Sequence, residues 1–280
     1  MRRFTFLILS LIISLNAGAF IEVRNSQFYN QGIPWRPIGV NLLPEQCDRS
    51  VLEDVANFGW NSIRIAPTSL QELKRYVKIA KREQLKICVV CTPDLSLDAI
   101  SAFKKNEQIW AWEVVSIEQA KQVRIHCPHH LVTLAIDAQL TNLDQVLMNP
   151  EIDFLSVVLT PLELGWVTPT SLYLGLRNCY MKSGDLFQKI ERRMSIAEKP
   201  ILVSSCSYPR DKMFKLPHSS TSLRDSYFNF VMNYQSPTKR IKIGGVFFEK
   251  WESIPTEENE DYCTPMSIFA SDTLTQNVLF

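Results

Sequence analysis

Two short stretches bring together cysteines and histidines, the residue types that hold metal ions and exchange disulfides. Cys88 and Cys91 stand three residues apart inside the apolar run 86–91, which has the composition of a strand. Side chains alternate between the two faces of a strand, so these sulfur atoms would point apart and suit neither one metal ion nor a redox pair. The His-Cys-Pro-His-His cluster at 126–130 directly precedes another apolar run. We interpret this cluster as the structural entry to a strand.

Carboxylates follow several apolar runs of the chain, where they are placed to act as acids, bases or nucleophiles. Glu118 falls at the start of an expected helix, and the helix dipole favours an acid in the first turn. We therefore interpret Glu118 as a structural acid. The other acids of this kind, which we interpret as loop acids or as support for other side chains, are Asp94, Asp137, Glu163 and Glu249.

The glycine signatures of nucleotide and hydrolase sites are missing from the sequence. It contains no Gly-x-Ser-x-Gly and no glycine-rich phosphate loop, and only 9 of its 280 residues are glycine. We therefore expect no nucleotide, no metal ion and no other cofactor.

Apolar runs alternate with amphipathic stretches along most of the chain, and these elements must position the acids. The expected strands are 36–41, 62–66, 86–91, 109–115, 131–136, 154–159, 201–204 and 244–248. The expected helices are 50–58, capped by Ser50, and 70–84, 142–149, 183–198 and 222–234. Alternating strands and helices indicate a parallel sheet, and eight strands indicate an α/β protein with a single (β/α)8 TIM barrel. A small β-hairpin over residues 21–32 is expected to precede the barrel. In such barrels the site residues follow the carboxyl ends of the strands.

The first 19 residues have the pattern of a secretory signal peptide. Arg2 and Arg3 precede the apolar run 4–15, and Ala17-Gly18-Ala19 fits a small-residue cleavage site. The run is too short to span a bilayer comfortably. We expect cleavage near Ala19, a secreted or periplasmic protein with no membrane attachment, and one barrel domain over residues 20–280.

The composition is that of an ordinary globular protein with a balanced charge. Without Arg2 and Arg3, 28 of the 30 basic residues remain against 29 acidic ones, a formal charge of −1. A near-neutral chain without a basic run gives no reason to expect nucleic acid as a partner. The seven cysteines are irregularly spaced and odd in number, so we interpret them as small buried hydrophobes and not as a disulfide framework.

Five stretches carry patterns that recur together in one enzyme family. They are NQGIPWRPIGVN at 30–41, GWNSIR at 59–64, IDFLSVVLTPLELGW at 152–166, KPILVSS with YPRD within 199–211, and MSIFASDT at 266–273. In this order they resemble the β-mannanase branch of glycoside hydrolase family 5. The resemblance runs from about Phe20 to Leu279 and implies the same barrel, with β-mannan or a related polysaccharide as ligand.

The resemblance also locates the family's catalytic groups, and most of these positions hold other residues here. The acid/base glutamate of the family falls on Ile117, and its nucleophilic glutamate falls on Ser205. The positions of the orienting histidine, of the aromatic residue after it and of a sugar-lining tryptophan hold Val158, Thr160 and Phe248. Arg64, which steadies the nucleophile in the resembling enzymes, is retained.

These substitutions affect the chemistry that the family performs. Retaining glycoside hydrolysis needs two carboxyl groups about 5–5.5 Å apart. Ile117 cannot move a proton, and Ser205 would need a neighbouring base, for which His218 is the one candidate. The resemblance therefore implies a catalytically degenerate barrel with no catalytic residue, which binds polysaccharide or supports another protein. The candidate sugar-binding residues are Trp166, Phe248 and Arg64.

Two alternatives remain open at this point. One is an active retaining glycoside hydrolase of the endo-β-1,4-mannanase type that uses relocated carboxylates, and the other is a remnant without a function of its own. The partner of Arg64 should show how the site is built, because a guanidinium in a partly dry barrel mouth needs a hydrogen-bond or ion-pair partner. With Ser205 in the nucleophile position, the expected partners are Glu249, Asp137 or backbone carbonyls. Glu113, inside an expected strand, is interpreted as part of the scaffold.

Overall fold

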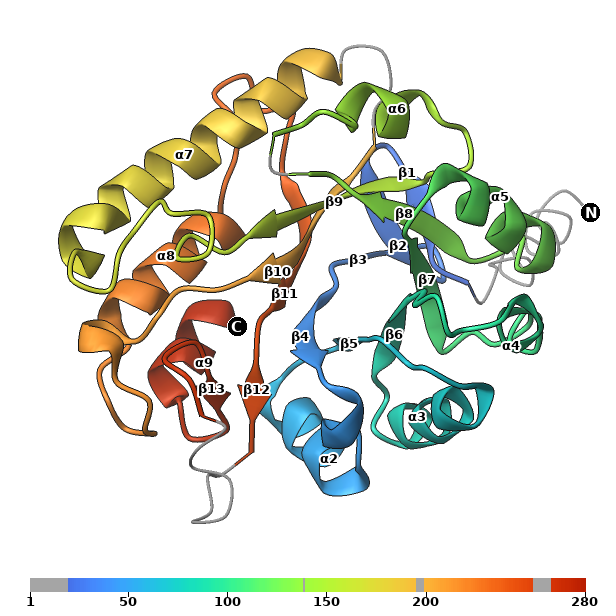
Figure 1. Ribbon diagram of the computed structural model, residues 1–280, viewed down its shortest axis with the longest axis horizontal. Helices are drawn as coiled ribbons and strands as arrows, with labels where there is room; N and C mark the ends of the chain where they lie inside the picture. Colours follow the sequence, from blue (N-terminus) through green and yellow to red (C-terminus); the bar gives the residue numbers. More distant parts are fainter. Residues whose placement is uncertain (1–19, 138, 195–198, 254–262) are drawn as a thin grey trace, which may run out of the picture.

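The computed structural model describes residues 20–137, 139–194, 199–253 and 263–280, and its centre is a closed parallel barrel (Figure 1). The expected signal peptide lies outside the described residues. The barrel strands are β4 (Ile38–Leu42), β5 (Ser62–Ile65), β6 (Lys86–Val90), β7 (Ile109–Val114), β8 (Leu131–Ala135), β9 (Phe154–Leu159), β10 (Ile201–Cys206) and β11 (Ile243–Phe248). Each strand pairs with the next, and β11 closes the ring on β4. The predicted eight-stranded barrel is confirmed.

Helices surround the barrel and cover the outer faces of its strands (Figure 1). They are α2 (Arg49–Phe58), α3 (Leu70–Arg82), α4 (Leu97–Ser101), α5 (Ile117–His126), α6 (Leu143–Met148), α7 (Leu172–Arg193), α8 (Ser222–Met232) and α9 (Thr273–Leu279). Strands covered on both faces must be apolar nearly throughout, and all six residues of β7 are buried. Among the described residues, no helix combines the length and the apolar character needed to cross a membrane.

Two helix starts differ from the sequence prediction. The N-cap of α2 is Asp48, which accepts a hydrogen bond from the Val51 amide, while the Ser50 hydroxyl donates to the Asp48 carboxylate. Helix α7 begins at Leu172, well before the predicted start at residue 183. Its first turn exposes Tyr173 and Leu174, so no clean apolar stripe marks this turn in the sequence.

A small antiparallel sheet covers the amino ends of the barrel strands. The predicted hairpin is present and extends into three strands, β1 (Glu22–Arg24), β2 (Gln27–Asn30) and β3 (Ile33–Trp35). Phe28 is 1% exposed and meets Trp110 and Phe154 edge-on, with ring centroids 5.4 and 5.2 Å away. This aromatic cluster fills the lumen at the end opposite the expected site.

The cysteines are all buried, as expected of small hydrophobic residues. Cys88 belongs to the cluster that fills the lumen, whereas Cys91 belongs to the larger core outside it. The two sulfur atoms of the Cys-x-x-Cys stretch thus lie in different parts of the core. Burial raises the pKa of the Cys88 thiol well above its usual value, with a further contribution from the Glu113 carboxylate.

His130 is the one fully buried histidine of the cluster at 126–130, and it should make the protein acid-labile. It is 1% exposed, Nε2 lies 2.9 Å from the Asn106 carbonyl, and burial lowers its pKa to about 4. Between pH 6.5 and 4 the unfolded chain binds this proton and the folded chain does not. Stability should therefore fall by about 3 kcal/mol as the pH drops through this window.

Urea unfolding at pH values from 7.5 to 4 measures this loss. Because His130→Gln removes the titrating group, the difference in stability between wild type and variant should narrow toward pH 4. The exposed neighbour His129 provides the comparison, since His129→Gln should keep most of the pH-dependent loss, because burial is the main cause of the lowered pKa of His130. A wild-type profile that is no steeper than that of His130→Gln would contradict the prediction.

Candidate functional site

The carboxyl ends of the strands form a mouth lined by a few accessible side chains. Near the carboxyl ends of β4, β5, β9 and β10, one residue per strand is accessible between two buried neighbours; these residues are Asn41, Arg64, Val158 and Ser205. Asn41 pairs in register with Arg64, and Val158 pairs with Ser205. Val158 is 37% exposed although it lies within a strand, so solvent reaches down to this level of the lumen.

The guanidinium of Arg64 is bound across the lumen by Glu113. Arg64 Nη2 lies 2.6 Å from Glu113 Oε1, and Nε lies 3.1 Å from Oε2. Arg64 comes from β5 and Glu113 from β7, with β6 between them, so this two-point contact spans the interior of the barrel. Burial acts to lower the pKa of Arg64, but the neighbouring carboxylate outweighs it and the net shift is upward.

This contact corrects the sequence prediction for Arg64. Its ion-pair partner is Glu113, and not Glu249, Asp137 or a set of backbone carbonyls. The resemblance implies a scaffold role for Glu113, because it matches a Glu or Gln that is common inside this strand of the family. A signal was present, however: an acid within an otherwise apolar strand has to find a buried cation or donor.

Further polar groups complete a network that crosses the lumen. Ser156 Oγ donates to Glu113 Oε2 over 3.3 Å. Asn41 Oδ1 accepts from Arg64 Nη1 over 3.4 Å, and Asn41 Nδ2 donates to the Ser204 carbonyl over 3.1 Å. The network therefore joins β4, β5, β7, β9 and β10 beneath the mouth.

The two positions that the resemblance matches to the family's carboxylates differ in their surroundings. Ile117 is the first residue of α5, follows the N-cap Ser116, and packs half-buried against the outer core. Ser205 lies within β10 and is half-buried at the mouth. Neither side chain is an acid. Val158, which the resemblance matches to the family's histidine, is accessible, and Thr160, which it matches to the following aromatic residue, is buried.

The two aromatic candidates lie in different settings. Phe248 is fully buried beside Trp60 and Phe228, with ring centroids 5.5 and 4.5 Å away, so its ring is not open to a sugar, contrary to the sequence prediction. Trp166 follows β9 on the mouth side and is half-buried. Its backbone is held by Asn178, whose Nδ2 donates to the Trp166 carbonyl over 2.7 Å. Trp166 is therefore the aromatic candidate with an accessible ring.

Two of the acids considered as relocated catalytic carboxylates form contacts with neighbouring residues of their own segments. Glu118 lies in the first turn of α5, as predicted, and its side chain is 72% exposed beside Lys121. Asp137 accepts hydrogen bonds from the Thr141 and Asn142 amides, and the Thr141 hydroxyl lowers its pKa. Both acids therefore act locally.

Glu249 is different, because it combines burial with an unsatisfied oxygen. It directly follows β11, is half-buried, and its Oε2 has no hydrogen-bond partner. Burial raises the pKa of Glu249, and the exposed Glu163 carboxylate raises it further, against the opposing effects of Ser207 and Arg64. A carboxyl group with a raised pKa keeps its proton up to a higher pH and can then act as a proton donor.

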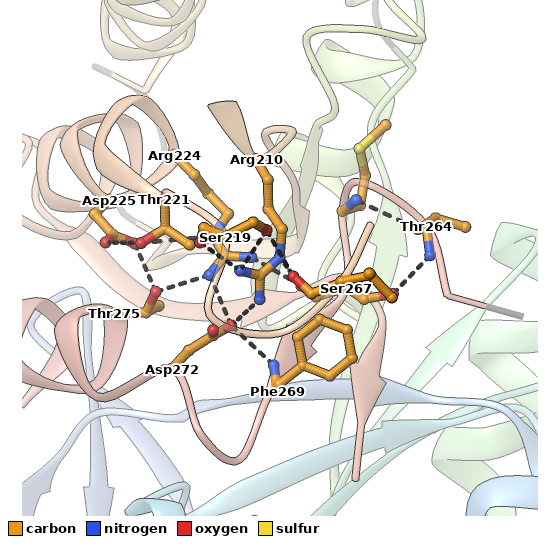
Figure 2. Close-up of polar contacts among 12 residues, drawn as sticks. Arg210, Ser219, Thr221, Arg224, Asp225, Thr264, Ser267, Phe269, Asp272 and Thr275 are labelled. Carbon is orange, nitrogen blue, oxygen red and sulfur yellow. Dashed lines mark hydrogen bonds and ion pairs between the residues drawn. The ribbon is translucent and has the colours of Figure 1, made fainter. Parts of the chain in front are cut away.

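A second buried network holds together two of the stretches that were matched to the enzyme family. Figure 2 shows Arg210 and Arg224 converging on Asp272, with both guanidiniums fully buried. Arg224 Nη2 lies 2.9 Å from Asp272 Oδ2 and 2.8 Å from Thr275 Oγ1. The Phe269 amide also donates to Asp272, over 2.9 Å. The stretches at 199–211 and 266–273 are thus joined by a structural ion cluster.

Metal chemistry finds no support in the described part of the chain. No group of three or more His, Cys, Asp or Glu side chains there is arranged to hold a metal ion.

Comparison with known proteins supports the fold. No family model matches the sequence, and no curated protein matches it. A glycoside hydrolase family 5 protein from Bacteroides vulgatus is 12% identical with a TM-score of 0.50, covering 82% of this chain and 61% of that one. A second glycoside hydrolase has 12% identity, a TM-score of 0.51 and coverages of 82% and 65%. A plant β-glucan endohydrolase has 12% identity, a TM-score of 0.56 and coverages of 83% and 97%.

Such low identity establishes a shared barrel fold and nothing finer. The chain matches less than two thirds of the length of the first two of these proteins. The fold is therefore one that glycoside hydrolases use, while substrate and activity have to be argued from the mouth itself.

Proposed function

We propose that this protein is a non-hydrolytic, carbohydrate-binding barrel whose ligand is β-mannan or a related polysaccharide. The observation that carries the proposal is the Arg64–Glu113 ion pair. In the enzymes that the sequence resembles, this arginine steadies a catalytic carboxylate at the position of Ser205. Here the positive charge of Arg64 is neutralised by Glu113 inside the lumen, so Arg64 does not need a nucleophilic carboxylate as its partner.

The same mouth retains groups that suit a neutral sugar. Asn41 and Ser205 offer polar atoms, and the accessible ring of Trp166 offers a flat apolar surface for a sugar face. The expected signal peptide would deliver the protein to the periplasm or the medium, where it would meet such polysaccharides. Binding would then localise the protein, or a partner that it carries, on the polymer.

Removing the ring of Trp166 should weaken glycan binding. The mature protein, residues 20–280, should be retarded in affinity gels that contain mannan or glucomannan. Trp166→Ala should weaken this affinity by about 1–3 kcal/mol, the range seen when an aromatic ring that stacks on a flat ligand is removed. Tyr173→Ala is the control, because this aromatic residue is 77% exposed on α7. Equal affinity of wild type and a folded Trp166→Ala variant would move Trp166 to a purely structural role.

One observation favours a second function, a working retaining glycoside hydrolase with relocated carboxylates. Glu249 has the raised pKa and the unsatisfied oxygen of a proton donor, and Glu163 is close enough to influence it. Reducing-sugar release from mannan, glucomannan and cellulose distinguishes the two functions. We expect no release above the blank from wild type, Glu249→Gln or Glu163→Gln. Release by wild type that Glu249→Gln abolishes would replace the binding function with the hydrolase.

A further inference from the structure

A second concave region lies at the opposite end of the barrel from the mouth. It is a cleft of about 630 Å³ beneath the amino ends of β10 and β11, between the small sheet β1–β3 and the segment that follows α8. Small-molecule sites commonly have volumes of about 300–1,000 Å³. Trp35 and Tyr234 contribute half-exposed aromatic rings to its wall.

The charge of this cleft is entirely of one sign among the residues described as lining it. Five cations line it and no acid does; the cations are Arg36, Lys199, Lys239, Arg240 and Lys242. The protein as a whole is nearly neutral, so this is a local concentration of positive charge. Arg240 lies near Glu191 and Lys199 lies near Asp153, whereas Arg36, Lys239 and Lys242 form no ion pair within the described part of the chain.

Two of these cations are half-buried and donate their hydrogen bonds to neutral backbone carbonyls. Arg36 donates from Nη2 to the Met232 carbonyl, its Nε has no partner, and burial lowers its pKa. The Lys199 ammonium donates to the Val146 and Asn149 carbonyls over 2.9 and 2.7 Å, and burial lowers its pKa to about 8. Arg36 is thus a cation removed from water without a counter-ion, which is destabilising, and a bound anion would supply that counter-ion.

We propose that this cleft binds a small organic anion that carries at least two phosphate, sulfate or carboxylate groups beside a flat apolar part. Arg36 and Lys199 meet one anionic group in the wall of the cleft, and the exposed Lys239 and Lys242 meet the other at its rim. Trp35 packs against the apolar part. The site is independent of the mouth, so it stands whether or not the proposed carbohydrate binding is correct.

Titration calorimetry of the mature protein with inorganic pyrophosphate and with citrate tests this proposal, against sodium chloride at equal ionic strength. At least one probe should bind with a Kd below about 1 mM. Lys239→Gln combined with Lys242→Gln should weaken that affinity about tenfold, because two charge-assisted contacts are lost. Both lysines are exposed, so the variant should fold like wild type.

The matched control removes two exposed lysines from α3, by Lys74→Gln with Lys78→Gln. This variant should bind the probes as wild type does. A preference for pyrophosphate would identify a phosphate-bearing ligand, and a preference for citrate a polycarboxylate. The proposal is overturned if neither probe binds more tightly than chloride, or if the α3 variant loses as much affinity as the cleft variant.

Discussion

Replacing Asp272 with alanine should lower the free energy of unfolding by about 3–5 kcal/mol, because two guanidiniums would be left buried without their shared carboxylate. Arg210 and Arg224 are both fully buried, and both contact Asp272 Oδ2. Asp225, 3.8 Å from Arg224, cannot neutralise both charges. The cluster joins the segment after β10, helix α8 and the turn before α9, so its loss should loosen the closing part of the chain (Figure 2).

The control for Asp272→Ala is an arginine–aspartate pair that is exposed to solvent. Arg193 and Asp144 lie 2.8 Å apart with side chains 62% and 67% exposed. Asp144→Ala should change stability by less than about 1 kcal/mol. Urea unfolding of wild type and the two variants at neutral pH measures both losses. Similar losses for Asp272→Ala and Asp144→Ala would show that burial does not determine the contribution of these pairs.

Glu113→Ala should also be strongly destabilising, by about 3–5 kcal/mol, because it strands the Arg64 guanidinium inside the barrel. The Glu113 side chain is 7% exposed and that of Arg64 is 19% exposed, so water can hydrate the unpaired guanidinium only partly. Replacing both partners by apolar residues, Glu113→Leu with Arg64→Met, should cost less than Glu113→Ala alone, since no unpaired charge remains.

Urea unfolding of these two variants distinguishes the free-energy cost of an unpaired buried charge from the cost of losing the contacts of the ion pair. A double variant that is less stable than Glu113→Ala would mean that the whole lumen network, and not the stranded charge, determines stability. The mannan affinity of the double variant then gives a second readout. Because Arg64 is itself a candidate sugar-binding residue, lost affinity in the folded double variant would assign Arg64 to the glycan site, and unchanged affinity would leave Trp166 as the principal contact.

The barrel strands are the part of the structure that the sequence predicted best. Each predicted strand agrees with an observed one to within about two residues, because a strand covered on both faces must be a nearly continuous apolar run. Helix boundaries were less accurate. The start of α7 escaped prediction since its first turn exposes apolar side chains.

For the candidate site, too, some features could be predicted from the sequence and others could not. The sequence alone identified Ile117 and Ser205 as non-acidic residues at positions where the resembling enzymes carry glutamates. It also placed Arg64 and Val158 on strands that end at the mouth, because alternation and strand order follow from local pattern. Whether any of these residues contacts a sugar remains a prediction.

The sequence by itself determined the barrel, its strands and the non-acidic identity of residues 117 and 205, because apolar periodicity and residue identity are local properties of the chain. Only the tertiary structure decided which distant side chains meet. It paired Arg64 with Glu113 across the lumen, joined Arg210 to Asp272, and assembled the basic cleft from β3, the start of β10 and the segment after α8. These contacts depend on strand register and barrel closure, which bring together residues that are far apart in the chain.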